Sequence, residues 1–267
     1  RIVMNRRFQL SAGTIVGVAA LLGFLLLWGG SVTQPASAME QMAENIRKAK
    51  SYKAVMTAEG QVNPEAGKPP VKHKMTGTIY WLAPGSSRSD FGGLAPEASG
   101  GPSLEADVTK IDLPDESREG ALREIIIDHK AKTFDKVELP KGFPSGEMVA
   151  KLGDFSGQAD RDLGSKEING KKAHGFEVDM QKLFPRPDVR ERGVAEIWLD
   201  GESSLPVLVQ FKMATDRREQ TMRIQDFQWN IDLDPKLFDT TVPKGYTEVT
   251  SRYAVPPKSG AAKTGAK

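Results

Sequence analysis

Histidine is the first residue type to weigh in this chain, because its ring nitrogens bind metals and exchange protons near neutral pH. His73, His129 and His174 each fall on the apolar side of a predicted strand. No H-E-x-x-H pattern or other paired spacing brings them together as ligands. We therefore expect no metal site and no cofactor.

Other catalytic patterns are equally scarce. The 267 residues include no cysteine, which excludes disulfides, thiolate zinc sites and cysteine nucleophiles. There is no G-x-S-x-G elbow, P-loop or G-x-G-x-x-G motif, and no carboxylate spacing nominates an acid–base pair. The formal net charge of +2 gives no basic footprint for nucleic acid. We expect a binding protein, not an enzyme.

The N-terminal segment predicts a membrane helix. The apolar stretch Ser11–Trp28 carries no charge, and at about 1.5 Å per residue a helix over it reaches about 27 Å. Arg6 and Arg7 in front of it favour a cytoplasmic N-terminus. We predict a cytoplasmic segment 1–10, an anchor or signal segment 11–30 and a linker 31–37.

A cleaved signal peptide is the alternative to a retained anchor. Ala36-Ser37-Ala38 forms an A-x-A site for signal peptidase. In both interpretations the domain 38–253 lies outside the cytoplasm, either periplasmic and tethered to the inner membrane or released into the periplasm. The Pro- and Gly-marked end, 254–267, is expected to be a disordered tail.

The exported domain alternates between apolar and polar residues over several runs. In the stretches 52–62 and 71–81 the apolar side chains share one parity, which is typical of strands with one buried face. Asn169-Gly170 predicts a tight hairpin turn. Further strands are expected at 125–129, 133–139, 163–168, 174–180, 194–199, 206–214 and 219–230.

Two helices and one ambiguous stretch complete the pattern. Short helices are expected at Ala38–Ala49 and at Gly146–Leu152, where Ser145 is a suitable N-cap. The Gly- and Pro-rich stretch 83–120 either hides a strand around Ser87–Phe91 or forms a functional flap. The predicted fold is α+β with predominantly antiparallel strands. It is a curved, incomplete barrel wrapped over one or two helices and preceded by a transmembrane helix.

Two segments resemble LolA-like proteins. Gly77-Thr-Ile-Tyr-Trp-Leu-Ala-Pro-Gly-Ser-Ser-Arg88 is similar to their glycine, strand, Pro-Gly turn and following arginine, and Leu233–Tyr246 is similar to their closing segment. The resemblance covers about Ala38–Tyr246. It implies a half-barrel with helices as a lid that binds acyl chains of lipoproteins or lipids. Related domains act as envelope-stress sensors that restrain an anti-sigma factor.

Candidate ligand-binding residues follow from the strand parity and from the resemblance. Methionine suits a tolerant apolar site because it is flexible and polarizable. Arg88, at the position of the family arginine, would bond to the lid or to a ligand head group; the alternative is an ordinary exposed strand arginine. For the apolar residues the alternative is packing against the helices. The candidates are Met56, Met75, Ile79, Trp81, Arg88, Phe176, Met180, Trp198, Phe211 and Met222.

These observations lead to two hypotheses about function. The first is an exported, membrane-anchored LolA-like domain that holds lipid or lipoprotein acyl chains for lipoprotein sorting in the envelope. The second is an envelope-stress sensor that binds a membrane protein partner such as an anti-sigma factor. The inner membrane is expected as a partner through residues 11–28, and nucleic acid is not.

Overall fold

The strands that alternation predicts join into one open sheet. The computed structural model describes residues 35–62, 70–95, 104–115, 122–139, 148–185, 192–215 and 218–249. The sheet has 12 strands in the order β12-β6-β5-β4-β3-β2-β1-β11-β10-β9-β8-β7, and the edge strands β12 and β7 do not pair with each other. Neighbouring strands are antiparallel except for β12 and β6.

The element bounds are as follows. The strands are β1 Ser51–Val62, β2 Val71–Leu82, β3 Ser86–Ala95, β4 Leu104–Pro114, β5 Leu122–Asp128, β6 Thr133–Leu139, β7 Arg161–Ile168, β8 Lys171–Asp179, β9 Arg192–Asp200, β10 Pro206–Ala214, β11 Arg218–Trp229 and β12 Thr247–Glu248. The α-helices are α2 Pro35–Lys48 and α3 Met180–Leu183, and the 3-10 helices are η1 Ala150–Asp154 and η2 Pro235–Phe238.

Most of the expected strands are confirmed, one open alternative is decided, and the bounds of both expected helices change. The ambiguous stretch 83–120 contains two strands, β3 and β4, so its strand alternative is the right one. The helix expected at Gly146–Leu152 is the 3-10 helix η1 over Ala150–Asp154, while Ser145 lies outside the described residues. Helix α2 begins at Pro35, within the stretch expected as a linker.

The expected membrane helix and the tail 254–267 lie outside the described residues. Within the described ranges, no helix combines the length and the apolar character needed to cross a bilayer.

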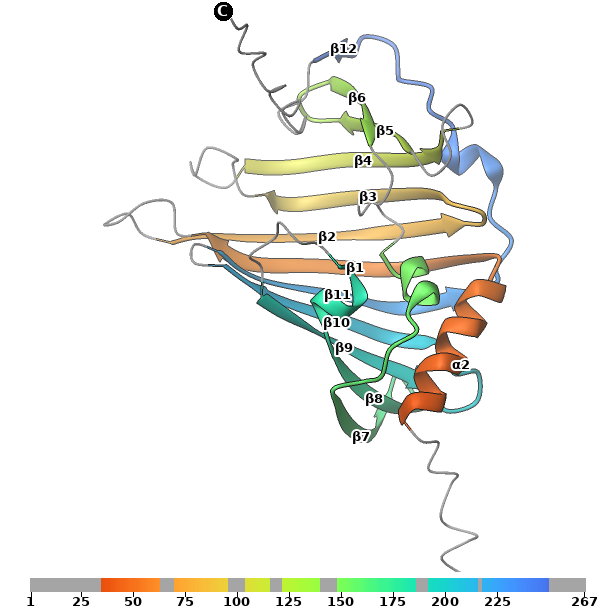
Figure 1. The fold of residues 1–267 in the computed structure, drawn as a ribbon. Coiled ribbons are helices and arrows are strands. Elements are labelled where there is room, and N and C mark those ends of the chain that lie inside the picture. Colours follow the sequence, from red (N-terminus) through yellow and green to blue (C-terminus); the bar gives the residue numbers. More distant parts are fainter. Residues whose placement is uncertain are drawn as a thin grey trace, which may run out of the picture.

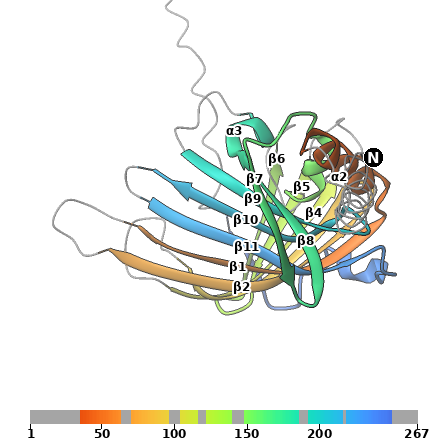
Figure 2. The same ribbon diagram turned by 90° about the horizontal axis from the view of Figure 1, so that it is seen from below.

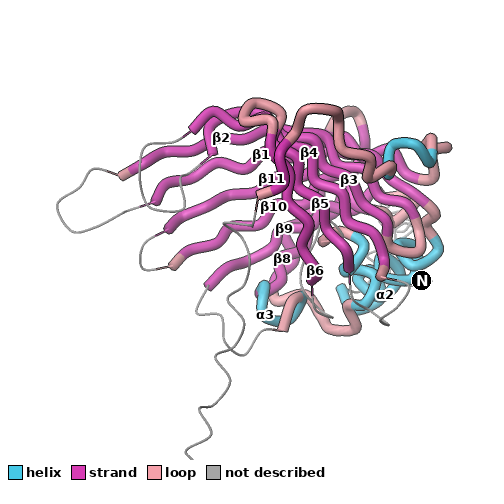
Figure 3. The backbone as a smooth tube through the Cα atoms, turned by 90° about the horizontal axis from the view of Figure 1, so that it is seen from above, coloured by secondary structure: helices cyan, strands magenta, loops and turns pink. Residues whose placement is uncertain are grey.

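The sheet bends into an open trough, and α2 lies on its inner side at one end of the strands (Figures 1, 2 and 3). Met39, Met42 and Ile46 of α2 are almost fully buried against this face. Helix η1 packs beside α2 and adds Leu152. The inner-face core residues from the strands are Tyr52, Ala54, Ile79, Trp81, Phe176, Val178, Ala195, Ile197, Leu199, Val209, Phe211 and Ile224.

The junction between β2 and β3 depends on a glycine. Gly77 pairs with Phe91, and a Cβ added to Gly77 would lie 2.1 Å from the carbonyl oxygen of Asp90 and 2.4 Å from Cδ1 of Phe91. No real Cβ atom tolerates such distances, so β3 approaches β2 this closely only because residue 77 lacks a side chain.

Candidate functional site

The inner face beyond α2 is apolar and only partly covered. Five methionines on this face, from four strands or strand ends and from α3, are half-buried. We call them the methionine floor. Since α2 packs over the Ser51 end of β1, the floor occupies the part of the trough farther along the strands (Figure 1). Its members are Met56, Met75, Met180, Met213 and Met222.

The strand register fixes how the floor is assembled. Residues directly opposite each other on neighbouring strands share a face of the sheet. Ala58 of β1 pairs with Met75 on one side and with Met222 on the other. Met222 in turn pairs with Phe211 of β10. A continuous apolar row therefore crosses four strands.

Glycine lets the floor continue toward α3. Met213 pairs with Gly193 of β9, and a Cβ added to Gly193 would lie 2.9 Å from the sulfur of Met180. The thioether of Met180 thus rests directly over the β9 backbone. Because thioethers are flexible and polarizable, this end of the floor can adapt to the shape of an apolar ligand.

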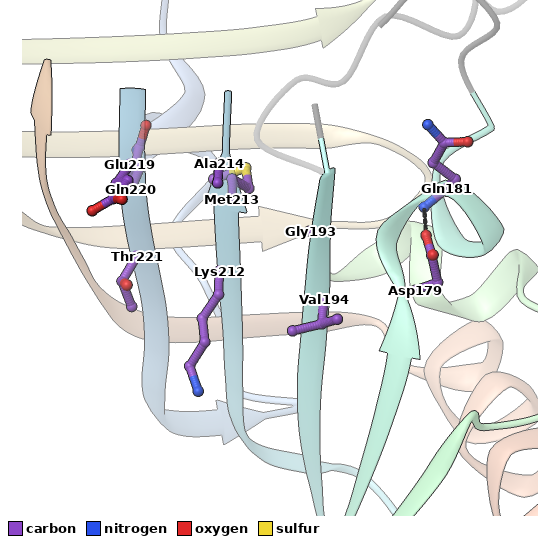
Figure 4. A pocket seen from close by; sticks show the side chains of 10 residues that line it. All are labelled: Asp179, Gln181, Gly193, Val194, Lys212, Met213, Ala214, Glu219, Gln220 and Thr221. Carbon is purple, nitrogen blue, oxygen red and sulfur yellow. Dashed lines mark hydrogen bonds between the residues drawn. The ribbon is translucent and has the colours of Figure 1, made fainter. Parts of the chain in front are cut away.

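A cavity of about 700 Å³ adjoins the floor at the ends of β9, β10 and β11. Figure 4 shows Gly193, Met213 and Gln220 at the ends of neighbouring strands, with Asp179 and Gln181 beside them on the α3 side. The cavity volume lies within the range of small-molecule sites. The remaining lining residues are Val194, Lys212, Ala214, Glu219 and Thr221.

The short helix α3 is held beside this cavity by two carboxylates. Asp179 caps the helix by accepting the Gln181 amide at 2.7 Å. Asp160 accepts the Asp179 amide at 2.8 Å and pairs with Lys182. The hydrogen bond from Lys182, followed by that from the Asp179 amide, lowers the pKa of Asp160. These contacts are largely exposed, and α3 buries Leu183, whereas α2 buries Met39, Met42, Ala43 and Ile46. Helix α3 is therefore fastened to the sheet less tightly than α2.

The same inner face becomes polar on β3, β4 and β5. The row that begins at Trp81 continues as Ser87, Asp112 and Glu124, all buried. The Ser87 hydroxyl donates to Asp112 at 2.8 Å, and Lys110 pairs with Glu124. The trough therefore has an apolar half, which contains the methionine floor, and a polar half, which does not suit an acyl chain.

Glu124 makes the stability of the polar half dependent on pH. Burial, followed by the nearby charge of Asp112, raises its pKa above the ordinary value of 4.5, and Lys110 opposes this only in part. The folded protein therefore holds the Glu124 proton more tightly than the unfolded chain. The contribution of Glu124 to stability is present at low pH and is lost as the pH rises through its raised pKa.

We expect the melting temperature of the native chain to rise relative to that of Glu124→Gln as the pH falls from 7 to about 4.5. The reason is that only the native chain takes up a proton at residue 124. Thermal melts at both pH values measure the difference. Glu44→Gln provides a control of opposite sign, since its hydrogen bond to Lys48 lowers the pKa of Glu44. A difference for Glu124→Gln that does not change with pH would contradict the assignment.

Eight of the ten candidate residues share the inner face. Met56, Met75, Met180 and Met222 belong to the methionine floor. The other four are buried in the core beneath or beside α2 and η1, as the packing alternative proposed: they are Ile79, Trp81, Phe176 and Phe211. Met213 was missed by the sequence reasoning, although it shares the parity of Phe211 on the same strand.

The remaining two candidates lie on the outer face. Trp198 falls between the inner-face residues Ile197 and Leu199 and belongs to a separate cluster, with Lys166 3.6 Å from the centre of its ring. Arg88 is half-buried; it pairs with Asp90 at 2.9 Å and donates to the Leu237 carbonyl of η2 at 3.1 Å. Neither side chain lies near the methionine floor.

The three histidines have separate surroundings. His129 contacts Thr109 and Tyr246, at 2.9 and 3.1 Å. His73 is buried on the inner face of β2. Within the described ranges, no group of three or more His, Asp or Glu side chains is arranged to hold a metal ion.

His174 hydrogen-bonds to a serine and an aspartate, as the histidine of a catalytic triad does, but the three residues lie outside the cavity described above. Its Nδ1 lies 2.9 Å from the Ser165 hydroxyl and its Nε2 lies 2.8 Å from Asp162. The 700 Å³ cavity is not lined by these residues, and the Gly164 amide, the backbone donor between Asp162 and Ser165, already donates to Asp162. The network ties the edge strand β7 to β8.

No protein-family model matches the chain, and no curated protein matches it. Several solved structures are similar. The lipoprotein LppX of Mycobacterium tuberculosis is 12% identical, with 76% of this chain and 99% of LppX covered and a TM-score of 0.42. A LolA superfamily protein from Nitrosomonas europaea is 12% identical, with 78% and 98% covered and a TM-score of 0.25.

The Pseudomonas aeruginosa MucA/MucB complex is also similar. It is 14% identical, with 78% of this chain and 61% of the matched chain covered and a TM-score of 0.35. One of these similar structures is named as a member of the superfamily that the two sequence segments resembled.

Proposed function

We propose that this chain is an exported lipid-handling protein of the cell envelope, tethered to the inner membrane, and that its methionine floor holds an acyl chain. One observation carries the proposal. Five half-buried methionines form a continuous apolar surface inside the trough, and α2 covers only the adjoining part of that face. A partly covered apolar surface of this kind is typical of a binding site.

The energetics suit a carrier. Each methylene that moves from water onto the floor contributes about 0.8 kcal/mol, so a long acyl chain binds without a dedicated polar contact. Methionine side chains repack around chains of different length and saturation. The proposed role is therefore binding and release of a lipid or of lipoprotein acyl chains, with no chemical step.

We expect the acyl chain to enter the methionine floor beside α3, because α2 is attached more firmly to the sheet than α3. Asn45 of α2 donates to the Ser203 carbonyl at 2.8 Å, and Arg47 donates to the Gly153 carbonyl. Helix α3 has four residues, of which Leu183 is buried in the core, and its hydrogen bonds to the sheet are exposed. Displacing α3 would open the 700 Å³ cavity onto the floor.

Thermal melting with and without lipid tests the proposal. Full chain stripped of lipid should melt at a lower temperature than the native preparation, and added dodecanoate should restore stability. At a hundredfold excess over the dissociation constant the gain is about 2.7 kcal/mol. For a domain of this size that corresponds to about 5–10 °C. A melting temperature indifferent to lipid would contradict the proposal.

Mass spectrometry of the chain purified from membranes separates the carrier from the sensor hypothesis. A co-purified lipid or lipopeptide supports the carrier. A single stoichiometric protein partner without lipid would contradict the carrier and favour a sensor, the kind of protein pairing that the MucA/MucB complex represents. The same spectrum reports the mature N-terminus and so decides between a retained anchor and cleavage near Ala38.

A further inference from the structure

His73 is a buried polar side chain that is 4% exposed. Neither of its ring nitrogens has a hydrogen-bond partner among the residues that the structure describes. A buried imidazole left in this state costs free energy, so a polar partner supplied from outside would be favoured. His73 lies near the start of β2, at the end of the sheet remote from α2 (Figure 1).

The His73 ring is directed across β1. It lies opposite Gly60, and a Cβ added to Gly60 would be 3.0 Å from Cε1 of the imidazole. The ring thus occupies the space that a side chain at position 60 would fill. Beyond Gly60 the next strand presents Gln220, which pairs with Gly60, and Arg218, which pairs with the neighbouring Val62.

A second orphaned donor lies on that strand. Nε of Arg218 is buried and has no hydrogen-bond partner among the described residues. Arg218 is close enough to His73 for its positive charge to lower the pKa of the imidazole, after the larger effect of burial. At neutral pH His73 is therefore uncharged and offers one N–H, while Arg218 supplies the positive charge.

The charged side chains near His73 divide between the two faces of the sheet. Lys72, Lys74 and Glu59 have the opposite parity to His73 and line a cavity of about 340 Å³ on the outer face, with Glu59 3.7 Å from the Lys74 ammonium. Glu219 of β11 also has outer-face parity and accepts from the Gln61 amide at 3.3 Å. Among the described residues opposite Gly60 and Val62 on the inner face, Arg218 is the charged one, and its positive charge favours an anionic occupant.

His73 and Arg218 lie on the same face of the sheet as the methionine floor. Along β1, Gly60 follows Met56 and Ala58 on the same face, so His73 lies about 14 Å beyond the Met56 row. An acyl chain laid on the floor along β1 would bring its polar end to His73 and Arg218. The His73 imidazole and Nε of Arg218 would then donate to the same anionic group, at the end where the apolar surface stops.

We propose that His73 and Arg218 form a head-group site for an acyl lipid with an anionic terminus, a carboxylate or a phosphate. This inference rests on the proposed function, since it assigns the polar end of the same ligand. In the water-poor setting of His73, hydrogen bonds to an anion are stronger than at the surface. The neutral imidazole donates one hydrogen bond and the guanidinium donates another while balancing the charge.

Isothermal titration of the lipid-stripped full chain tests the site with probes of equal chain length. Dodecanoate and dodecyl phosphate carry the anion, and dodecanol lacks it. We expect both anionic probes to bind about tenfold or more tightly than dodecanol. In Arg218→Met and His73→Phe this preference should fall to about twofold or less, while the affinity for dodecanol stays the same. Lys53→Met, which removes an outer-face cation of β1 near Tyr80, should leave the preference intact.

Three results would overturn the head-group site. Equal binding of dodecanoate and dodecanol to the native chain would refute it while leaving the acyl site in place. Failure of all three probes to bind would refute both. Inorganic phosphate that binds as tightly as dodecyl phosphate would show a site for a free anion instead of a lipid.

A measurement on the native chain guards against variants that do not fold. In NMR titrations, bound dodecanoate should raise the pKa of His73, because the carboxylate favours the imidazolium form. Bound dodecanol should not raise it. The same pKa with both ligands would overturn the assignment of His73.

Discussion

Gly77→Ala is expected to lower the stability of the domain by about 3 kcal/mol, because the added methyl group would collide with the neighbouring strand. The added Cβ would meet the Asp90 carbonyl oxygen at 2.1 Å, and this oxygen belongs to the backbone of β3 and cannot rotate away. Strands β2 and β3 would have to separate at the boundary between the apolar and polar halves of the trough. Thermal melting should fall by about 6–12 °C.

Gly92→Ala is the matched control. Gly92 lies on β3 opposite Thr76, next to the Gly77 pair, and a Cβ there would approach the Ala106 carbonyl oxygen only to 3.8 Å. Alanine at position 92 should be neutral or slightly stabilising, because it restricts the unfolded chain. Equal losses for the two variants would show that the close approach of β3 is not what position 77 requires.

Met222→Gln is expected to weaken the binding of dodecanoate and dodecanol alike by about tenfold. Met222 lies at the centre of the apolar row, between Ala58 and Phe211. Glutamine has a similar length, but its amide would lose water when the acyl chain covers it and would find no partner on this surface. Because the side chain is half-buried and not fully buried, the fold should survive the change.

Arg223→Gln controls for this substitution. It introduces the same side chain one position further along β11, at an exposed residue on the opposite face. Binding should be unchanged. If Met222→Gln bound both probes as well as the native chain does, the methionine floor would not be the acyl site. A loss for dodecanoate alone would place Met222 at the head group instead.

Much of the sheet could be predicted from the sequence because alternation is a local signal. The runs 52–62 and 71–81 alternate cleanly and become β1 and β2. The Asn169-Gly170 pair forms the turn between β7 and β8, with both residues at positive φ, the conformation that these residue types tolerate. The second strand in the stretch 83–120, β4, was missed because its inner face carries Lys110 and Asp112.

The candidate site was harder to predict. The parity of a strand position limits which face its side chain lies on, but it does not show which side chains a helix covers. On β9 both parities carry large apolar residues, so the sequence could not show that Ile197 faces the core while Trp198 packs on the outer face. Alternation also cannot tell which inner-face residues α2 covers. Trp81 and Met75 share one face of β2, yet only Trp81 is buried in the core. That difference depends on where the helix ends.

Strand β1 pairs with β2 on one side and with β11 on the other, where Tyr52 lies opposite Trp229. The ribosome delivers β1 early and its second neighbour almost last, so one edge of β1 stays unpaired during most of synthesis. An unpaired apolar edge is prone to aggregate. We therefore expect a chain truncated before residue 218, which lacks β11, to leave this edge of β1 unpaired and to aggregate more readily than the full chain.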